Sequence, residues 1–309
     1  MIKKYKNYTV CIIFLLLISF FNNASYSASK DAGTVAAVFL RLGVGARAIG
    51  MGNTFTAIAD GINATYGNPA GVINLRVPEA NLMHNKWLAD ISYGYAGYAQ
   101  PLTDKSALAA SMIYVDYGSI EGRDISGYRI SDPTAKDRAF AITYGRKLND
   151  KVITGMNVKY ISEKYERESA SGFTMDLGLL YTPRIEKVLF GLSVQNIGKS
   201  IKFVTDKFKP PLTCRFGISH KFYQDKLVAG IDFVKARDTN LDLSTGIEWK
   251  FNNTVAVRSG YTTESDIGNG FSAGIGFYLS RFVIDYAFSP FGELGDTHRF
   301  SLTYKFPER

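Results

Sequence analysis

Two glycine pairs near the N-terminus are the residues whose spacing most directly suggests chemistry. Gly43-x-Gly45 and Gly50-x-Gly52 resemble the glycines that let a backbone approach phosphate groups. Neither pair completes a GxGxxG motif between a strand and a helix, and no GxxxxGK[ST] motif occurs. The pairs therefore predict close backbone packing in a confined space rather than nucleotide binding.

The histidines and serines give no catalytic or metal-binding arrangement. His84, His220 and His298 lack the HExxH spacing, and none has a second His three to five residues away. No G-x-S-x-G motif is present to hold a serine nucleophile. We therefore expect no enzyme activity, no metal and no cofactor.

The first residues have the pattern of a secretory signal peptide. Lys3, Lys4 and Lys6 precede an apolar run over residues 10–18, and small residues follow near Ser27. We expect residues 1–27 to be removed. No later segment has about 20 consecutive apolar residues, so no membrane-spanning helix is expected.

The net charge and the cysteines argue against two further classes of protein, those that bind nucleic acid and those held together by disulfides. Without its three signal lysines, the formal charge of +8 falls to +5 (8 minus 3), which is too small to suggest nucleic acid binding. Cys11 leaves with the signal, so Cys214 remains alone and cannot form an internal disulfide.

From about Pro78 onward, apolar and polar residues alternate with a period of two. Near the C-terminus, residues 300, 302, 304 and 306 are apolar or aromatic, while residues 299, 301, 303 and 305 are polar or charged. Side chains of a strand alternate across a sheet, so such segments have one apolar and one polar face. About 14 segments have the length of tilted membrane strands. They begin near residues 79, 91, 107, 138, 152, 172, 188, 212, 227, 241, 254, 270, 282 and 297.

The connections between these segments alternate in length. Short turns follow the even-numbered segments, whereas longer loops over residues 118–137, 165–171, 198–210, 262–269 and 289–296 follow odd-numbered ones. Outer-membrane barrels have short periplasmic turns and long outer loops. The pattern predicts an all-β membrane protein, an antiparallel outer-membrane β-barrel of about 14 strands.

Charges and aromatic residues fit this prediction. Asp116 and Arg146 fall on apolar faces but close to strand ends, where a charge costs little. Most aromatics suit interfacial girdles, and we expect ligand or partner contacts only at Phe203, Phe208, Phe288 and Phe291. The charges predicted on the polar face are Arg215, Asp232, Asp242, Glu248, Arg258, Arg281, Asp285 and Arg299.

Residues 28–77 lack the alternation and are rich in Gly and Ala. A helix is predicted over residues 34–42, a second from Asn53 to Ala59, and a tight turn at residues 67–71. We predict that residues 28–77 form a short, partly helical hatch in the lumen, that residues 78–306 form the barrel, and that residues 307–309 are a tail.

Several motifs resemble those of a known family. The N-terminal ones are GVGARA (43–48), Met51-Gly52, Ala57-x-Ala59-Asp60 and NPAG (68–71), and the C-terminal ones are DYAFSPFG (285–292) and GDTHRFSL (295–302). Together they resemble the PorV/PorQ family, which belongs with the FadL-like outer-membrane barrels. The resemblance implies a 14-stranded barrel with the N-terminal segment inside.

The resemblance also implies functional residues. In FadL-like proteins the Asn-Pro-Ala turn belongs to the hatch. Phe300, Leu302, Tyr304 and Phe306 resemble a barrel-assembly signal, although the chain continues for three residues beyond the aromatic that usually ends it. The residues expected to form the hatch or gate are Gly45, Arg47, Gly50, Gly52, Asp60, Asn68, Pro69 and Ala70.

Two functions follow from the resemblance. A PorV-type member would accompany type IX secretion and bind exported proteins or secretion components with its outer loops. A FadL-type member would be a passive channel for hydrophobic small molecules, gated by the hatch. Either protein would lie in the outer membrane of a Gram-negative type of cell, in contact with its lipid and the barrel-assembly machinery. We expect the secretion role, with the channel as the alternative.

Overall fold

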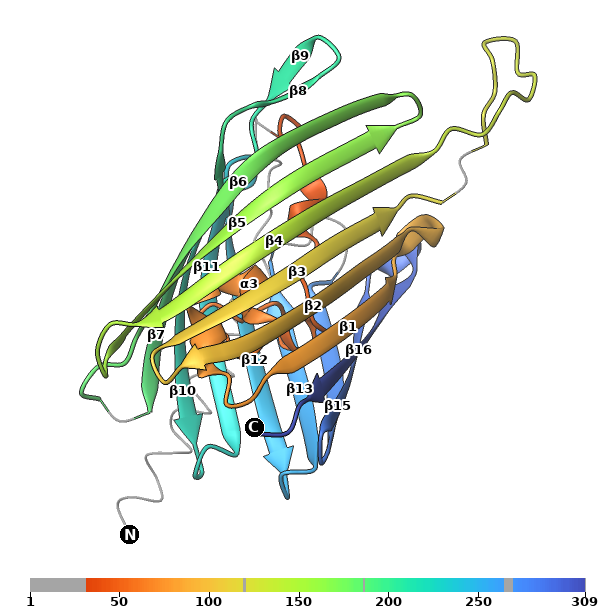
Figure 1. Cartoon of the computed structure of the whole chain (residues 1–309). Coiled ribbons are helices and arrows are strands. Elements are labelled where there is room, and N and C mark those ends of the chain that lie inside the picture. Colours follow the sequence, from red (N-terminus) through yellow and green to blue (C-terminus); the bar gives the residue numbers. More distant parts are fainter. Residues whose placement is uncertain (1–31, 119–120, 186, 264–268, 309) are drawn as a thin grey trace.

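The computed structural model describes residues 32–118, 121–185, 187–263 and 269–308. In these residues, 14 antiparallel strands form a closed barrel around a short N-terminal segment (Figure 1). The predicted fold class is confirmed. No helix in the described ranges is both long and apolar enough to cross a membrane. The predicted signal peptide lies outside the described residues.

The strands begin within a few residues of the predicted positions. They are β1 (Glu79–Lys86), β2 (Ser92–Thr103), β3 (Ser106–Asp116), β4 (Ala135–Lys147), β5 (Val152–Tyr165), β6 (Glu168–Tyr181), β7 (Val188–Gly198), β8 (Ile201–Phe203), β9 (Asp206–Phe208), β10 (Thr213–Phe222), β11 (Leu227–Ala236), β12 (Leu241–Phe251), β13 (Val255–Thr262), β14 (Phe271–Leu279), β15 (Phe282–Pro290) and β16 (Asp296–Lys305).

Each barrel strand pairs with its neighbours in sequence, with one exception. Strand β7 pairs with β10, because β8 and β9 form a separate hairpin. The barrel closes where β1 pairs with β16, from Glu79 opposite Lys305 to Lys86 opposite His298. Closure gives each barrel strand a paired neighbour on both sides, as a barrel in lipid requires.

The two ends of the barrel differ as expected, except at one loop. Turns after the even-numbered segments are short, and the longest loops, over 117–134 and 199–212, lie at the opposite end. The loop predicted over residues 165–171 is wrong, because β5 and β6 extend to a two-residue turn at Glu166 and Arg167. Glu166 has a positive φ of 51°, which suits such a tight hairpin.

The outer face carries an apolar band with aromatic residues at both ends. Ile142, Leu177 and Ile284 are exposed in the middle of their strands. On the inner face of the barrel, polar and charged side chains are buried, including Arg215, Asp232, Glu248 and Arg299. Arg281 is an exception, because it lies exposed in the β14–β15 turn rather than on the polar face. Aromatic residues near the two ends of the band are Phe140, Tyr160, Phe173 and Phe271 toward the long loops, and Tyr144, Tyr181, Trp249 and Phe282 toward the short turns.

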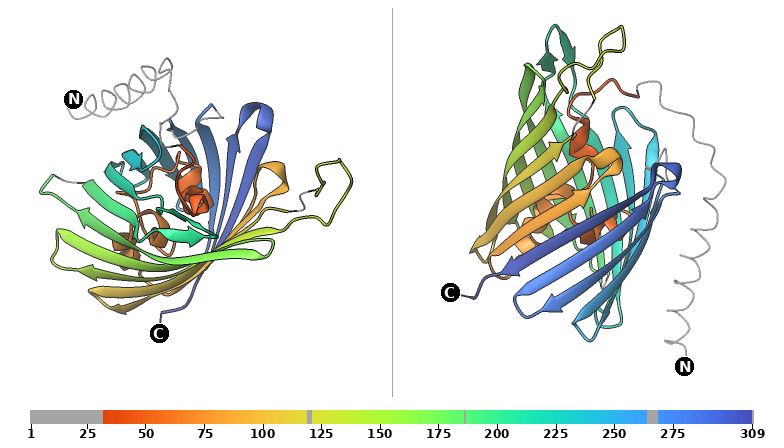
Figure 2. Two further views of the ribbon diagram at one scale, coloured as in Figure 1. Left: turned by 90° about the horizontal axis from the view of Figure 1, so that it is seen from above. Right: turned by 90° about the vertical axis from the view of Figure 1, so that its right-hand side faces the viewer.

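The segment before β1 runs through the lumen from the long-loop end to the short-turn end (Figures 1 and 2). We call residues 32–77 the hatch. At its start, the amide of Ala36 donates to the carbonyl of Lys209 beside the β8–β9 hairpin (3.0 Å). Its short helices are η1 (Val38–Arg41), α2 (Ala46–Ile49), α3 (Ala64–Gly67) and η2 (Pro69–Asn74), and the loops between strands add η3 (Leu88–Asp90) and η4 (Gly292–Leu294).

The helix predicted from Asn53 to Ala59 is wrong. Asn53 has a positive φ of 60°, and the amides of Phe55 and Thr56 donate to the Asp232 carboxylate at 2.9 and 2.8 Å. The wall thus satisfies backbone groups that a helix would otherwise pair internally. The predicted turn at residues 67–71 is instead the end of α3 and the start of η2.

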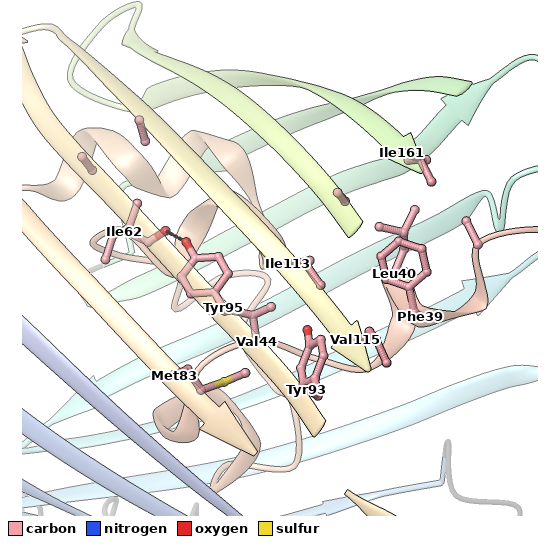
Figure 3. Close-up of a cluster of buried hydrophobic side chains, with 14 of the residues drawn as sticks. Phe39, Leu40, Val44, Ile62, Met83, Tyr93, Tyr95, Ile113, Val115 and Ile161 are labelled. Carbon is pink, nitrogen blue, oxygen red and sulfur yellow. Dashed lines mark hydrogen bonds between the residues drawn. The ribbon is translucent and has the colours of Figure 1, made fainter. Parts of the chain in front are cut away.

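One side of the hatch packs through apolar contacts against β1–β5. Phe39, Leu40, Val44 and Ile62 of the hatch lie against wall residues such as Tyr93 (Figure 3). All five are less than 5% exposed. Burial of a large apolar side chain contributes about 1.5–3 kcal/mol, so this contact holds the hatch firmly to one wall.

Glycines on the inner wall let the hatch come close. A Cβ at Gly217 would lie 2.9 Å from the Ala57 amide nitrogen, and one at Gly178 would overlap the Asn68 side chain. Gly246 lies close to Met51 of the hatch and Gly274 close to Gly50, whereas Gly276 is crowded by the wall side chains of Asp285 and Arg258. The expectation that these glycines serve close packing in the lumen is confirmed.

Replacement of Gly178 by Leu tests this packing. The larger side chain should displace the Asn68–Pro69 turn and lower the free energy of unfolding by about 1–3 kcal/mol, the usual cost of overpacking. Equilibrium unfolding in detergent micelles, followed by tryptophan fluorescence, measures the change. Gly94→Leu is the control, because a Cβ there meets only ordinary contact, 3.7 Å from the Met83 carbonyl. Equal stability of the two variants would contradict the account.

Candidate functional site

One cavity lies at the long-loop end, between the hatch and β14–β16. Its volume is about 400 Å³. Trp87, Phe271 and Phe291 give it aromatic walls, and Leu42 and Ile49 of the hatch add aliphatic ones. We call it the upper cavity. Its size and apolar lining are typical of sites for small hydrophobic ligands.

The upper cavity reaches the barrel wall where two strands separate. The β14–β15 ladder ends at Ala273 opposite Phe288, although both strands continue for two more residues. Those residues, among them Ser272, Ser289 and Pro290, line the cavity. Proline has no backbone N–H to donate to a neighbouring strand, which limits pairing at this point. We call this unpaired stretch the seam.

Arg299 supplies the charge at the inner side of the upper cavity. It is 3% exposed, donates to the carbonyl of Gly43 at 3.1 Å and lies 4.9 Å from the centre of the Trp87 ring. Among the described residues no carboxylate lies within ion-pair distance of it. A buried cation without an anion is costly, so Arg299 is a strongly polar point in the lining. The ion pair of Arg41 with Asp238 (2.9 Å) is a second one.

A second cavity lies at the short-turn end, and its lining is very different. Its volume is about 390 Å³, and we call it the lower chamber. Four basic and four acidic side chains line it: Arg47, Arg76, Lys250, Lys305, Asp60, Glu79, Asp285 and Glu308.

The helical turn α2 lies between the two cavities. Ile49 of α2 lines the upper cavity, whereas Arg47 of the same turn lines the lower chamber. The turn packs against β14–β16, and its first amide, on Ala46, donates to Ser301 Oγ at 2.9 Å. A single helical turn therefore separates the two spaces.

Buried ion pairs fasten α2 to the wall. Arg47 Nε and Nη2 donate to the two carboxylate oxygens of Glu248 at 2.8 and 3.0 Å. Arg47 Nη1 also donates to Asp60, a half-exposed residue of the hatch itself, at 2.5 Å. Arg258 also donates to Glu248 (2.7 Å), and to Asp285 (2.7 Å). Glu248 is fully buried, and its bidentate pairing with Arg47 is a strong, directional contact.

The rest of the hatch is held mainly through its backbone. Asp232 accepts from the amides of Phe55 and Thr56, and Arg215 donates to the Asn53 carbonyl at 2.9 Å. On β7, which pairs with β10, Gln195 donates to the carbonyl of Gly67 at 3.0 Å. Polar residues of the inner wall therefore provide the hydrogen-bond partners that regular secondary structure would provide elsewhere.

The predicted hatch residues fall into two groups. Arg47, Gly50, Gly52 and Asp60 lie on the side of the hatch that meets β12–β16 and the cavities. Gly45 lies just before them, and its amide donates to Met83 Sδ of β1. Asn68, Pro69 and Ala70 lie against β5 and β6, where Asn68 also donates to the Leu179 carbonyl. The structure does not bring the two groups into one site.

Other predicted residues are dispersed. Phe300, Leu302, Tyr304 and Phe306 lie along the outer surface of β16 and its end. Phe291 lines the upper cavity and Phe288 packs on His298, whereas Phe203 and Phe208 line a separate cavity of about 230 Å³ under the β8–β9 hairpin.

Sequence reasoning missed Trp87 and the joint role of Glu248 and Arg258. The two charges were expected on the inner face, but their pairing depends on strand register and on Arg47, which lies 201 residues before Glu248 in the chain. Trp87 follows β1 directly in a short loop, where an aromatic residue also fits an interfacial girdle.

Comparisons with known proteins agree with this fold. The model of an uncharacterised protein family (UPF0164) matches residues 18–129, which include the hatch and the first three strands. A search of the curated proteins gives no match.

Solved structures with the same architecture are outer-membrane channels of the FadL type. The CymD monoaromatic hydrocarbon channel is 13% identical with a TM-score of 0.65, over 86% of this chain and 98% of its own. The Ralstonia pickettii toluene transporter TbuX is 15% identical with a TM-score of 0.65, over 87% and 100%. A Pseudomonas aeruginosa FadL homologue is 13% identical with a TM-score of 0.54, over 91% and 99%. At these identities the likeness establishes the fold.

Replacement of Glu248 by Gln tests the seal formed by α2. The change keeps the shape but leaves Arg47 and Arg258 without their shared anion, and loss of one partner of a buried pair costs about 3–5 kcal/mol. We expect α2 to loosen and the ion conductance of the barrel in planar bilayers to rise above a low wild-type value.

The control is Asp225→Asn, which removes an exposed ion pair with Lys187 (3.7 Å). Exposed pairs contribute only about 0–1 kcal/mol, so its conductance should equal that of the wild type. A Glu248→Gln barrel that conducts no more than this control would show that the network does not seal the lumen.

Proposed function

We propose that this protein is an outer-membrane channel for passive diffusion of hydrophobic small molecules. The observation that carries the proposal is the apolar upper cavity, which reaches a gap between two wall strands while a fastened hatch blocks the lumen below it. The likeness of the fold to channels named for toluene and monoaromatic hydrocarbons supports the same class of solute.

The upper cavity suits a solute of this class. Aromatic rings of Trp87 and Phe291, 5.2 Å apart at their centres, form part of its wall. An apolar solute gains free energy by leaving water for such a site, at about 25 cal/mol for each Å² that it buries. Arg299 adds a place for a polar or anionic end of the solute.

The seam gives this solute a way out through the wall. Phe271 and Pro290 stand at the long-loop end of the apolar outer band, so a solute between β14 and β15 meets lipid directly. Sideways release requires no movement of the hatch and keeps the solute in an apolar environment throughout.

Passage along the barrel axis is much less favourable. It would need α2 to leave its place, which exposes the buried ion pairs of Glu248. It would also carry an apolar solute into the lower chamber, whose lining holds eight charged side chains. We therefore assign the hatch the role of a seal that keeps water and ions from crossing while solute leaves sideways.

The secretion role expected from the PorV/PorQ resemblance has less support. It would rely on the loops over residues 118–137 and 198–210 to bind exported proteins. The second loop carries the β8–β9 hairpin, where Ile201 is buried against the barrel rather than offered to a partner. The described part of the first loop extends away from the barrel (Figure 1). Two of the similar structures, CymD and TbuX, are named for monoaromatic hydrocarbons and toluene and not for protein export.

A disulfide across the seam tests the route. Ser272 and Ser289 occupy the next opposite positions beyond the last β14–β15 pair, so cysteines there should cross-link and close the gap. With Cys214→Ser as background, oxidised cells carrying Ser272→Cys/Ser289→Cys should take up an apolar fluorescent probe several-fold more slowly than reduced cells.

The control is Ser162→Cys/Ser171→Cys, a second serine pair on opposite positions of fully paired strands, β5 and β6. Its oxidation should leave uptake unchanged. Undiminished uptake through a cross-linked seam would exclude sideways release, and uptake no faster than in cells without the protein would exclude the channel itself.

A further inference from the structure

Three basic side chains gather on the outer surface of β4 and β5, at their long-loop ends. Lys136 and Arg138 of β4 and Lys164 of β5 belong to the outward-facing alternation of their strands. Lys136 and Lys164 are directly opposite partners across the ladder. Like charges in opposite positions are about 5 Å apart at Cβ and destabilise a sheet unless something neutralises them.

The surrounding residues neutralise only one of the three. Asp116 of β3, opposite Lys136, lies 3.1 Å from its ammonium nitrogen and also accepts from the Tyr114 hydroxyl at 2.7 Å. Arg138 lies over the Tyr114 ring, 5.8 Å from its centre. In the described ranges no carboxylate is within ion-pair distance of Arg138 or Lys164. The patch therefore carries two uncompensated positive charges.

The patch sits just above the apolar band. In the next outward row toward the short turns, Phe140, Tyr160 and Phe173 are 48%, 40% and 67% exposed, as expected for residues that face lipid. Between this row and the loops, Ser162 and Ser171 form an opposite pair that adds two hydroxyl groups. Lipid headgroups lie at this depth, next to the aromatic ends of a membrane barrel.

We propose that Lys136, Arg138 and Lys164 bind the phosphate of a lipid headgroup in the outer leaflet. Arg138 can offer two parallel N–H donors to phosphate oxygens, and the two lysines supply charge from one side. The acyl chains then run down the wall over Phe140 and Tyr160. This site is on the outside of the barrel, far around the wall from the seam, and does not depend on the channel function.

Native mass spectrometry of the detergent-purified protein tests the site. The probes are dipalmitoyl phosphatidic acid, dipalmitoylglycerol with the same chains but no phosphate, and inorganic phosphate alone. We expect the phosphatidic acid to bind at least tenfold more tightly than the diacylglycerol. A basic residue near an anionic lipid contributes about fivefold in affinity. The substitution Arg138→Gln should therefore weaken the binding of phosphatidic acid about fivefold, and replacement of all three basic residues by Gln should weaken it about 100-fold.

Arg146→Gln is the matched control, because Arg146 faces outward on the same strand at the opposite end, between Ser106 and Thr154. Its affinity should equal that of the wild type. All the substituted side chains are exposed or half-buried, and unchanged heat-modifiable gel mobility confirms the fold. Equal losses in Arg138→Gln and Arg146→Gln, or no loss in either, would overturn the proposal. Displacement of phosphatidic acid by millimolar inorganic phosphate would show that the site binds free phosphate and not the phosphate of a lipid headgroup.

Discussion

The structure depends on the match between the hatch backbone and the polar inner wall. The hatch has only short helical turns, so many of its amides and carbonyls have no internal partner. Asp232, Gln195 and Ser301 supply those partners from three different strands, and wall glycines bring them within reach. Without these hydrogen-bond partners, each buried and unpaired backbone group would cost several kcal/mol in a lumen closed to bulk water.

The two sides of the hatch are held by different forces, and the cavities follow from that difference. Toward β1–β5 the contact is mainly apolar (Figure 3), and Asn157 and Glu163 of β5 add hydrogen bonds to the hatch backbone. Toward β12–β16 the contact consists of separate ion pairs and hydrogen bonds around Glu248, with open space above and below. Of the two spaces on that side, the upper cavity has the more apolar lining and suits a hydrophobic solute better.

Strand positions could be predicted because the outer face of the wall contacts lipid and is apolar, whereas the inner face is polar. The period of two therefore persists through each strand. The loop predicted at residues 165–171 was wrong because β5 and β6 extend beyond the apolar band, where polar residues no longer alternate visibly. The helix predicted from Asn53 failed because its backbone partner, Asp232, is a distant wall residue. The pairing of Glu248 with Arg47 and Arg258 likewise depends on register and on the hatch path, which no local pattern contains.

The central claim is that apolar solutes occupy the upper cavity and the seam but never the lower chamber. Photolabelling of outer-membrane vesicles with a small apolar diazirine, followed by mapping of the modified residues, measures this directly. The account predicts labels on Trp87, Phe271 and Pro290 and none on Arg76 or Lys250. Strong labelling of Arg76 or Lys250 would contradict it and would show that solute crosses along the barrel axis.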